Sequence, residues 1–104
     1  NREEVKKVVE IQFGIIAKMM KENHVNIEAT PEAIDWLAQL GYDPQFGARP
    51  VKRVLQKRVV NELSKQLLAG KVQPDSEIML DVFNGDFVFR NKIEKEIKKN
   101  VSLN

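Results

Sequence analysis

The stretch GYDPQFGARPVKRVLQKRV, from Gly41 to Val59, decides how this chain folds. Glycine and proline interrupt its first ten positions, and apolar residues at helical spacing follow from Val51 onward. Gly47 gives the backbone freedom just before the helical part, and Pro50 suits the first turn of a helix. The stretch therefore predicts a tight elbow that ends one helix and begins the next.

The elbow carries two aromatic residues and one arginine. We expect Tyr42 and Phe46 to pack against the core and hold the turn, so that Phe46→Ala costs about 3–5 kcal/mol if the ring is buried. Arg49 stands where free backbone N–H groups and the helix dipole favour an anion, and its planar guanidinium suits a phosphate. An ion pair between Arg49 and a local carboxylate such as Asp43 is an equally good interpretation of these residues.

Helix and strand patterns lie on both sides of the elbow. Thr30 suits a helix cap, and Asn84-Gly85 is a strong hairpin signal. Gly14, inside the first helical pattern, is interpreted as a point of close backbone approach. Helices are expected over residues 3–23, 31–40 and 50–69, and strands over 24–29, 77–82 and 86–90. The order α-β-α-α-β-β predicts an α+β fold with three helices packed on a short, roughly three-stranded sheet.

Composition limits the possible functions of the 104-residue chain. With 42% hydrophobic and 31% charged residues it suits one soluble globular domain, and a formal charge of +2 is too small to indicate nucleic-acid binding. No apolar run approaches ~18 residues and the first residues are charged, so we expect neither a membrane span nor a signal peptide. Cysteine is absent and His24 is interpreted as a solvated turn residue, so we expect no metal site or catalytic residue.

The elbow and its flanking segments carry a family resemblance. The stretch from Gly41 to Val59 closely resembles the sensor II region of the Clp subgroup of AAA+ ATPases. The segments VVEIQF (Val8 to Phe13) and LLAGKV (Leu67 to Val72), with the expected strand pair, are most similar to the C-terminal small domain of the ClpB-type protein disaggregase. The resemblance implies an AAA+ small, or lid, domain over residues 1–92, followed by a basic, flexible tail over residues 93–104.

The resemblance also implies a nucleotide contact. Arg49 would be the sensor II arginine, which reaches the terminal phosphates of ATP, and Ala48 would lie beside the nucleotide. The first helix around Val8 to Phe13 would form one wall of the adenine pocket. ATP and its Mg would be bound mainly by a preceding large domain, because the chain itself carries no phosphate-binding loop. The chain alone is therefore not expected to hydrolyse ATP.

The partners implied by the resemblance belong to a larger machine. They are the preceding large ATPase domain, the neighbouring subunits of a homo-hexameric ring, a DnaK-type chaperone, and the aggregated proteins that the ring threads. A cytoplasmic location is expected, and nucleic acid is not expected as a partner. One departure concerns Glu62, where the family often has proline, so that the third helix should be less interrupted here.

Two other function classes stay open. A small basic nucleic-acid-binding domain would use the cations of the third helix, and salt-dependent binding to DNA or RNA would favour it. A pure protein–protein oligomerisation module would bind a specific protein, and Arg49 would then have no effect on any response to nucleotide.

Overall fold

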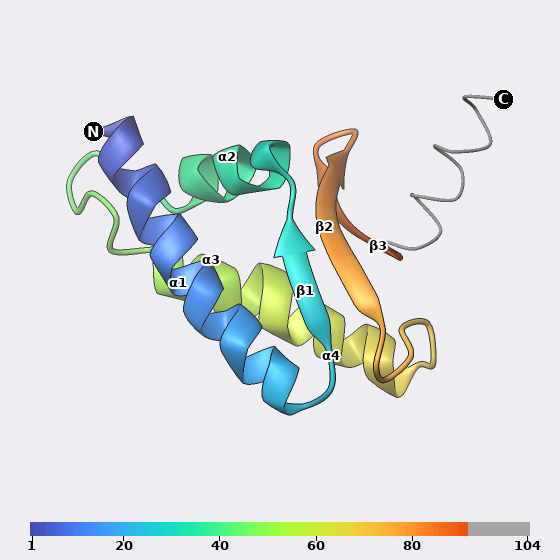
Figure 1. The fold of residues 1–104 in the computed structure, drawn as a ribbon. Coiled ribbons are helices and arrows are strands. Elements are labelled where there is room, and N and C mark those ends of the chain that lie inside the picture. Colours follow the sequence, from blue (N-terminus) through green and yellow to red (C-terminus); the bar gives the residue numbers. More distant parts are fainter. Residues whose placement is uncertain (92–104) are drawn as a thin grey trace, which may run out of the picture.

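The first helix, α1 (Arg2–Glu22), begins the computed structural model, which describes residues 1–91. The Asn1 side chain accepts a hydrogen bond of 3.1 Å from the backbone N–H of Glu4 and caps the helix. One face is buried at helical spacings, by Val5, Val9, Phe13 and Met20. Helix α1 thus forms one wall of the core (Figure 1). The expected boundary at residue 92 and the tail over 93–104 lie outside the described residues.

The second helix, α2 (Pro31–Leu40), is linked to the sheet through its N-cap residue, Thr30. As the sequence predicted, Thr30 caps it, because its hydroxyl accepts a hydrogen bond of 3.1 Å from Ala33 N–H. The same hydroxyl donates to Asp81 Oδ1 at 3.1 Å, and Arg90 Nε donates to the other oxygen of that carboxylate at 3.1 Å. One carboxylate therefore links the start of α2 to two strands.

An ion pair joins the first two helices on the surface. Lys6 Nζ lies 3.1 Å from Asp35 Oδ1, so the two helices are connected by charge as well as by apolar packing. The hydrogen bond with Asp35 raises the pKa of Lys6 above its ordinary value, and the negative charge of the same carboxylate adds to the effect.

Three strands form a mixed sheet, and their number agrees with the short, roughly three-stranded sheet that the sequence predicted. Strand β1 (Asn26–Ala29) runs parallel to β2 (Glu77–Phe83), and β2 runs antiparallel to β3 (Asp86–Asn91), in the order β1-β2-β3. Asn84 and Gly85 have φ values of 52° and 80°, as expected for the central residues of a tight hairpin turn. The predicted hairpin is therefore confirmed.

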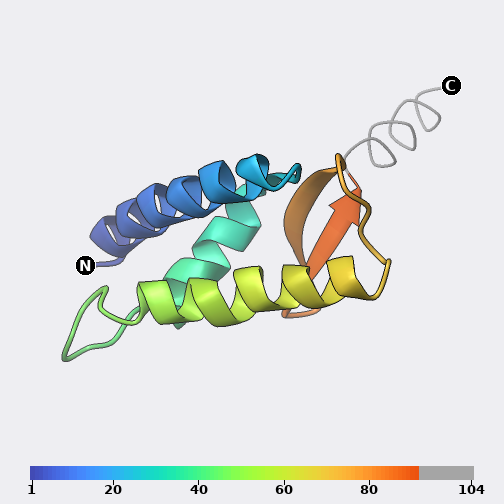
Figure 2. The same cartoon turned by 90° about the horizontal axis from the view of Figure 1, so that it is seen from below.

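The third helical segment is one continuous rod with an unexpected turn in its middle (Figure 2). It consists of α3 (Val51–Leu55), the π-helical turn η1 (Gln56–Val60) and α4 (Asn61–Leu68). In η1 the Asn61 N–H donates to the Gln56 carbonyl, five residues earlier. The helix predicted over residues 50–69 is present and continues through Glu62 without a break, but no sequence pattern had indicated the π turn.

The spacing of the buried residues gives the π turn a physical reason. The core-facing residues of the rod follow each other at intervals of four: Val51, Leu55, Val59 and Leu63. In a regular α-helix each interval of four advances about 40° beyond a full turn, so three intervals would drift by roughly 120°. A π turn contains more residues per turn and reduces this drift, which keeps the four side chains on one buried line.

The two helices on either side of the elbow make a backbone contact at Gly41. A Cβ atom at this buried position would lie 2.8 Å from Val51 Cγ2 and 3.1 Å from the Leu37 carbonyl oxygen. No side chain fits there unless α2 and α3 move apart. Gly14, by contrast, is exposed, and a Cβ atom there would meet nothing within 4 Å. The interpretation of Gly14 as a close approach is therefore wrong.

Two glycine substitutions test this contact. Gly41→Ala should lower the free energy of unfolding by about 1–3 kcal/mol, because it overpacks the contact with Val51. Gly14→Ala is the matched control, and it should raise the free energy of unfolding by about 0.5–1 kcal/mol because alanine is the better residue in an exposed helix. Urea unfolding followed by circular dichroism measures both. A Gly41→Ala value within about 0.5 kcal/mol of the unsubstituted chain would contradict the contact.

Candidate functional site

The elbow, residues 41–50, is closed by its own hydrogen bonds. Asp43 N–H donates to the Gly47 carbonyl at 2.8 Å, and Gly47 N–H donates to the Asp43 carbonyl at 2.7 Å. Asp43 Oδ1 also accepts from the N–H groups of Gln45 and Phe46, at 2.8 and 3.0 Å. Gly47 has a φ of 63°, which glycine adopts without strain. The backbone and one carboxylate therefore define the shape of the loop.

Both aromatic residues of the elbow lie outside the core. Tyr42 is 46% exposed and Phe46 is 51% exposed, so the prediction that they pin the turn against the core is wrong. The hydrogen bonds of Asp43 close the loop without help from the rings. The core contact at this point is made by Gly41 and Val51, which leaves the rings on the surface.

Arg49 extends from the elbow, and its side chain is exposed. Its guanidinium carbon lies 5.1 Å from the centroid of the Phe46 ring, which is a cation–π distance. Its backbone N–H donates to the Phe46 carbonyl at 3.2 Å. Within residues 1–91 Arg49 makes no ion pair. The alternative pairing of Arg49 with Asp43 is not present.

The structure brings the predicted site residues together at the start of α3. Ala48 is half-buried, and its carbonyl accepts a hydrogen bond of 3.1 Å from Val51 N–H. Arg49 follows it on the exposed side. Phe46 joins this group as a residue that the sequence reasoning had assigned to the core. Its position three residues before Arg49 in a tight turn was the available signal, because such a turn brings the two side chains together.

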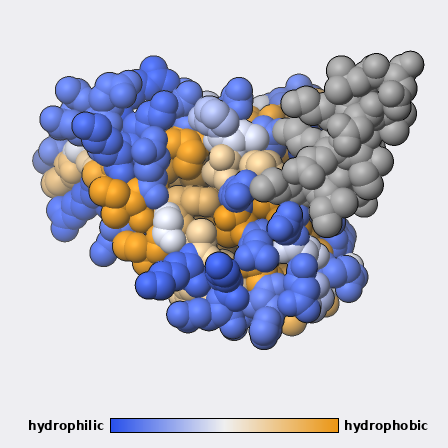
Figure 3. Space-filling model, viewed as in Figure 1, coloured by the Kyte–Doolittle hydropathy of each residue, from blue (hydrophilic) through white to orange (hydrophobic). Residues whose placement is uncertain are grey.

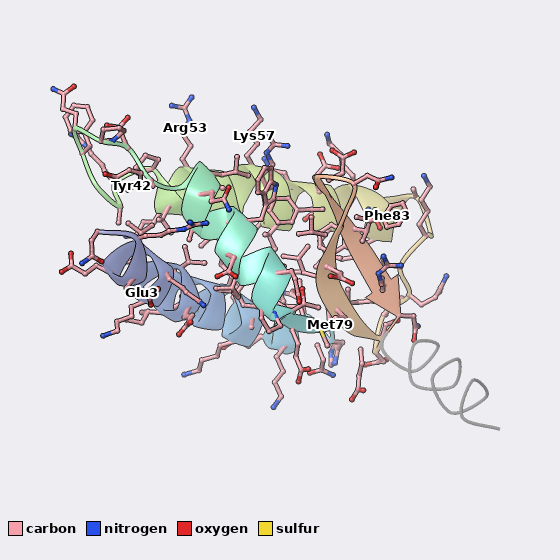
Figure 4. All side chains as sticks on the ribbon, turned by 90° about the horizontal axis from the view of Figure 1, so that it is seen from above. Glu3, Tyr42, Arg53, Lys57, Met79 and Phe83 are labelled. Carbon is pink, nitrogen blue, oxygen red and sulfur yellow. The ribbon has the colours of Figure 1, made fainter. Side chains whose placement is uncertain are left out.

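The elbow lies beside the first turn of α1 (Figure 4). An open hollow of about 660 Å³ lies between them. It is lined by residues from the start of α1, from the last turns of α2 and from the elbow: Asn1, Arg2, Ala38, Gln39 and Tyr42. The start of α1 and the elbow that carries Arg49 therefore share one end of the domain.

Helix α1 also exposes an apolar stripe. Ile11, Ile15 and Met19 follow one another at intervals of four and are 64%, 58% and 44% exposed. Apolar surface breaks up the polar surface on the face that carries α1 (Figure 3). Inside the segment expected to form an adenine wall, Val9 and Phe13 are buried in the domain's own core. Only the other residues of that segment are available to a ligand.

The described residues contain no candidate metal-binding site. In residues 1–91, no group of three or more histidine, aspartate or glutamate side chains could hold a metal ion. His24 has a positive φ of 65° after α1 and is exposed, with its Nδ1 3.6 Å from Asp75 Oδ1, as expected for a solvated turn residue. None of the helices described here combines the length and the apolar character needed to cross a bilayer.

Residues 1–80 match the family described as the C-terminal, D2-small domain of ClpB protein. The chain belongs to this family. The α+β fold and the elbow ahead of α3 are thus features of a ClpB D2-small domain, and the resemblance seen in the sequence is confirmed.

Individual relatives of this ClpB D2-small domain are chaperones by name. The chaperone protein ClpB of Bacteroides thetaiotaomicron is 44% identical over 88 residues, or 85% of this chain. The ClpB of Porphyromonas gingivalis is 45% identical over 89 residues, or 86% of the chain. A probable chaperone protein ClpB 1 of Chlorobaculum tepidum is 40% identical over 91 residues, or 88%. The matched region makes up 10%, 10% and 21% of these relatives, so the chain spans a small part of their length.

Truncation of Phe46 separates an elbow closed by hydrogen bonds from one held by aromatic packing. Phe46→Ala should change the free energy of unfolding by less than about 1 kcal/mol, because the ring lies on the surface. Leu63→Ala, at a fully buried position of α4, is the control and should cost about 2–5 kcal/mol. Urea unfolding of both variants is the measurement, and a Phe46→Ala cost close to that of Leu63→Ala would show that the ring supports the core.

Proposed function

We propose that this chain is the nucleotide-sensing lid of an ATP-dependent, ClpB-like chaperone, with Arg49 as the residue that contacts the ATP phosphates. The observation that carries the proposal is an exposed guanidinium, without an ion pair among residues 1–91, on an elbow that other groups close. Membership of the ClpB D2-small family supports the same role. Ala48, directly before Arg49 in the elbow, lies beside the nucleotide in this proposal.

The chemistry of Arg49 suits a terminal phosphate. A guanidinium presents planar N–H donors that match phosphate oxygens, and hydrogen bonds between charged groups are about twice as strong as those between neutral ones. The Phe46 ring restricts the directions in which the guanidinium can point. The described residues fit one phosphate contact but include no metal-binding group, so we assign Mg and most of the ATP contacts to a preceding large domain.

The start of α1 lies beside the elbow, which supports a lid role for the domain. A segment preceding Asn1 would join the domain beside the elbow, because Asn1, Arg2 and Tyr42 line the same hollow. A large domain attached there would have Arg49 within reach, and rotation of the lid would bring the guanidinium toward the phosphates or withdraw it. In the segment from Val8 to Phe13, burial of Val9 and Phe13 leaves Val8, Glu10, Ile11 and Gln12 for an adenine wall.

The parent protein would work as an assembly. We assign to it a homo-hexameric ring, in which the lid packs against the neighbouring subunit, and the threading of aggregated proteins together with a DnaK-type chaperone in the cytoplasm. The exposed stripe of Ile11, Ile15 and Met19 supports a packing role, because apolar surface at this spacing suits a protein partner. The relatives are themselves named chaperones.

Replacing Arg49 in the parent ATPase tests the proposed contact. Arg49→Ala should lower kcat/KM for ATP about tenfold to a hundredfold, because one charge-assisted phosphate contact is lost. Arg49→Lys should restore only part of it, since an ammonium keeps the charge but not the planar donors. In the 104-residue chain the same Arg49→Ala change should alter the free energy of unfolding by less than about 0.5 kcal/mol. A loss above ~2 kcal/mol with unchanged ATPase kinetics would make Arg49 a structural residue.

The chain alone should fold and show no ATPase activity. Its core is complete, but its sequence carries no phosphate-binding loop. Far-UV circular dichroism and steady-state phosphate release with Mg-ATP measure the two properties. ATPase activity that co-elutes with the chain in gel filtration, and increases in proportion to the concentration of the chain, would contradict this assignment.

A further inference from the structure

A group of cations on the third helical segment has no role in the proposed lid. Arg53, Lys57 and Arg58 are all exposed, and within residues 1–91 none of them makes an ion pair. Arg53 and Lys57 lie one turn apart and extend to the same side of the molecule (Figure 4). Three positive charges on one face, without an ion pair among the described residues, are a marked local excess in a chain whose formal charge is only +2.

These cations surround an apolar hollow. A depression of about 220 Å³ is lined by Leu40 at the end of α2, Val54 on α3 and the three cations, and we call this set of five residues the basic groove. Leu40 and Val54 are half-buried, so part of each side chain remains available to a ligand. The groove therefore combines an aliphatic floor with a positively charged rim.

A second hollow continues from the first. It measures about 280 Å³, shares Lys57 and Arg58 with the basic groove, and reaches the inner face of β3 at Phe87 and Phe89. Its other polar lining includes two carboxylates, from Glu62 and Asp86. The charge along the two hollows therefore changes from positive at Arg53 to mixed near β3.

The π turn positions the residues where the two hollows meet. Lys57 and Arg58 both belong to η1, and both line both hollows. A π turn is rare and is often found at functional sites. Here it allows the buried line of the helix to continue while two adjacent cations remain exposed beside the apolar floor.

The size and charge of the groove define its ligand. Each hollow is smaller than the roughly 300–1,000 Å³ of a typical small-molecule site, which suits a single inserted side chain. We propose that the basic groove binds an acidic segment of a partner protein, which inserts an aliphatic side chain between Leu40 and Val54. This binding needs neither ATP nor Arg49, so it stands or fails independently of the lid role.

The same observations disfavour a nucleic acid in the groove. Single-stranded nucleic acids bind by stacking their bases on aromatic side chains, and no aromatic side chain lines the basic groove. Two phenylalanines do line the second hollow, but Glu62 and Asp86 stand beside them and repel a phosphate backbone. These carboxylates repel an acidic peptide in the same way, so either ligand is confined to the basic groove, which contains no aromatic side chain.

A defined peptide tests the proposal on the 104-residue chain. The probe is a short fluorescein-labelled peptide of aspartate and glutamate around two leucines, titrated at about 50 mM salt and followed by fluorescence polarisation. We expect binding with a Kd below about 1 mM, weakened by added salt because the rim charges are exposed. Exchanging the leucines for serines should raise the Kd about tenfold, since the apolar contact is lost.

Matched charge variants locate the binding site. The triple variant Arg53→Gln, Lys57→Gln, Arg58→Gln should raise the Kd about tenfold, because it removes the whole rim. The control Lys7→Gln, Lys18→Gln, Lys21→Gln removes the same charge from exposed positions of α1 and should raise it less than about twofold. Amide shifts in ¹⁵N spectra of the unsubstituted chain with the peptide should centre on residues 53–58, which tests the site even if a variant fails to fold.

Four results would overturn the proposal. They are the absence of peptide binding at about 1 mM, an equal loss of affinity in the α1 control, amide shifts centred elsewhere, and tighter binding of a single-stranded oligothymidine of equal charge. The last result would assign the groove to nucleic acid instead.

Discussion

The contact between Gly41 and Val51 is the constraint on which the rest of this domain depends. It brings the end of α2 against the start of α3 at a distance that leaves no room for a side chain. Val51 is also the first of the buried residues that run along the third helical segment to Leu63. This glycine therefore sets how closely the end of α2 and the start of the long helix approach each other.

The elbow can close independently of its arginine because one carboxylate satisfies the loop. Asp43 accepts two backbone N–H groups through its side chain, and its own backbone pairs with Gly47. The exposed guanidinium of Arg49 lies over the Phe46 ring and makes no ion pair with that carboxylate. In the proposed function, Arg49 contacts an external phosphate without weakening the fold, because the loop is closed by other groups.

Local signals in the sequence predicted most of the fold. Thr30 and the pair Asn84-Gly85 each act through their own backbone geometry, and the structure confirms the cap and the hairpin. The helices and strands follow from apolar periodicity in the same way. The signals for Gly14 and Phe46 failed because they depend on what lies nearby in space. A glycine in a helix and an aromatic ring in a loop look alike in sequence whether they face the core or the solvent.

The candidate site was predicted only in part for the same reason. Arg49 is a candidate from the sequence alone, because its residue type and its position just before a predicted helix can both be read there. The partnership with Phe46 depends on a tight turn that brings the two side chains together. The basic groove requires Leu40 of α2 to meet residues of α3 and η1. The π turn was hidden because its cause is the match between a four-residue spacing and a core that spans several elements.

The elbow should be rigid before any ligand binds, with or without the guanidinium of Arg49. Backbone ¹⁵N relaxation of the 104-residue chain, with and without the Arg49→Ala change, measures this most directly. Order parameters at residues 43–47 should be about 0.85 in both proteins, as in well-ordered backbone. Values below about 0.6 in the unsubstituted chain, or a fall to that level in the Arg49→Ala variant, would show that the elbow is flexible or needs its guanidinium to form.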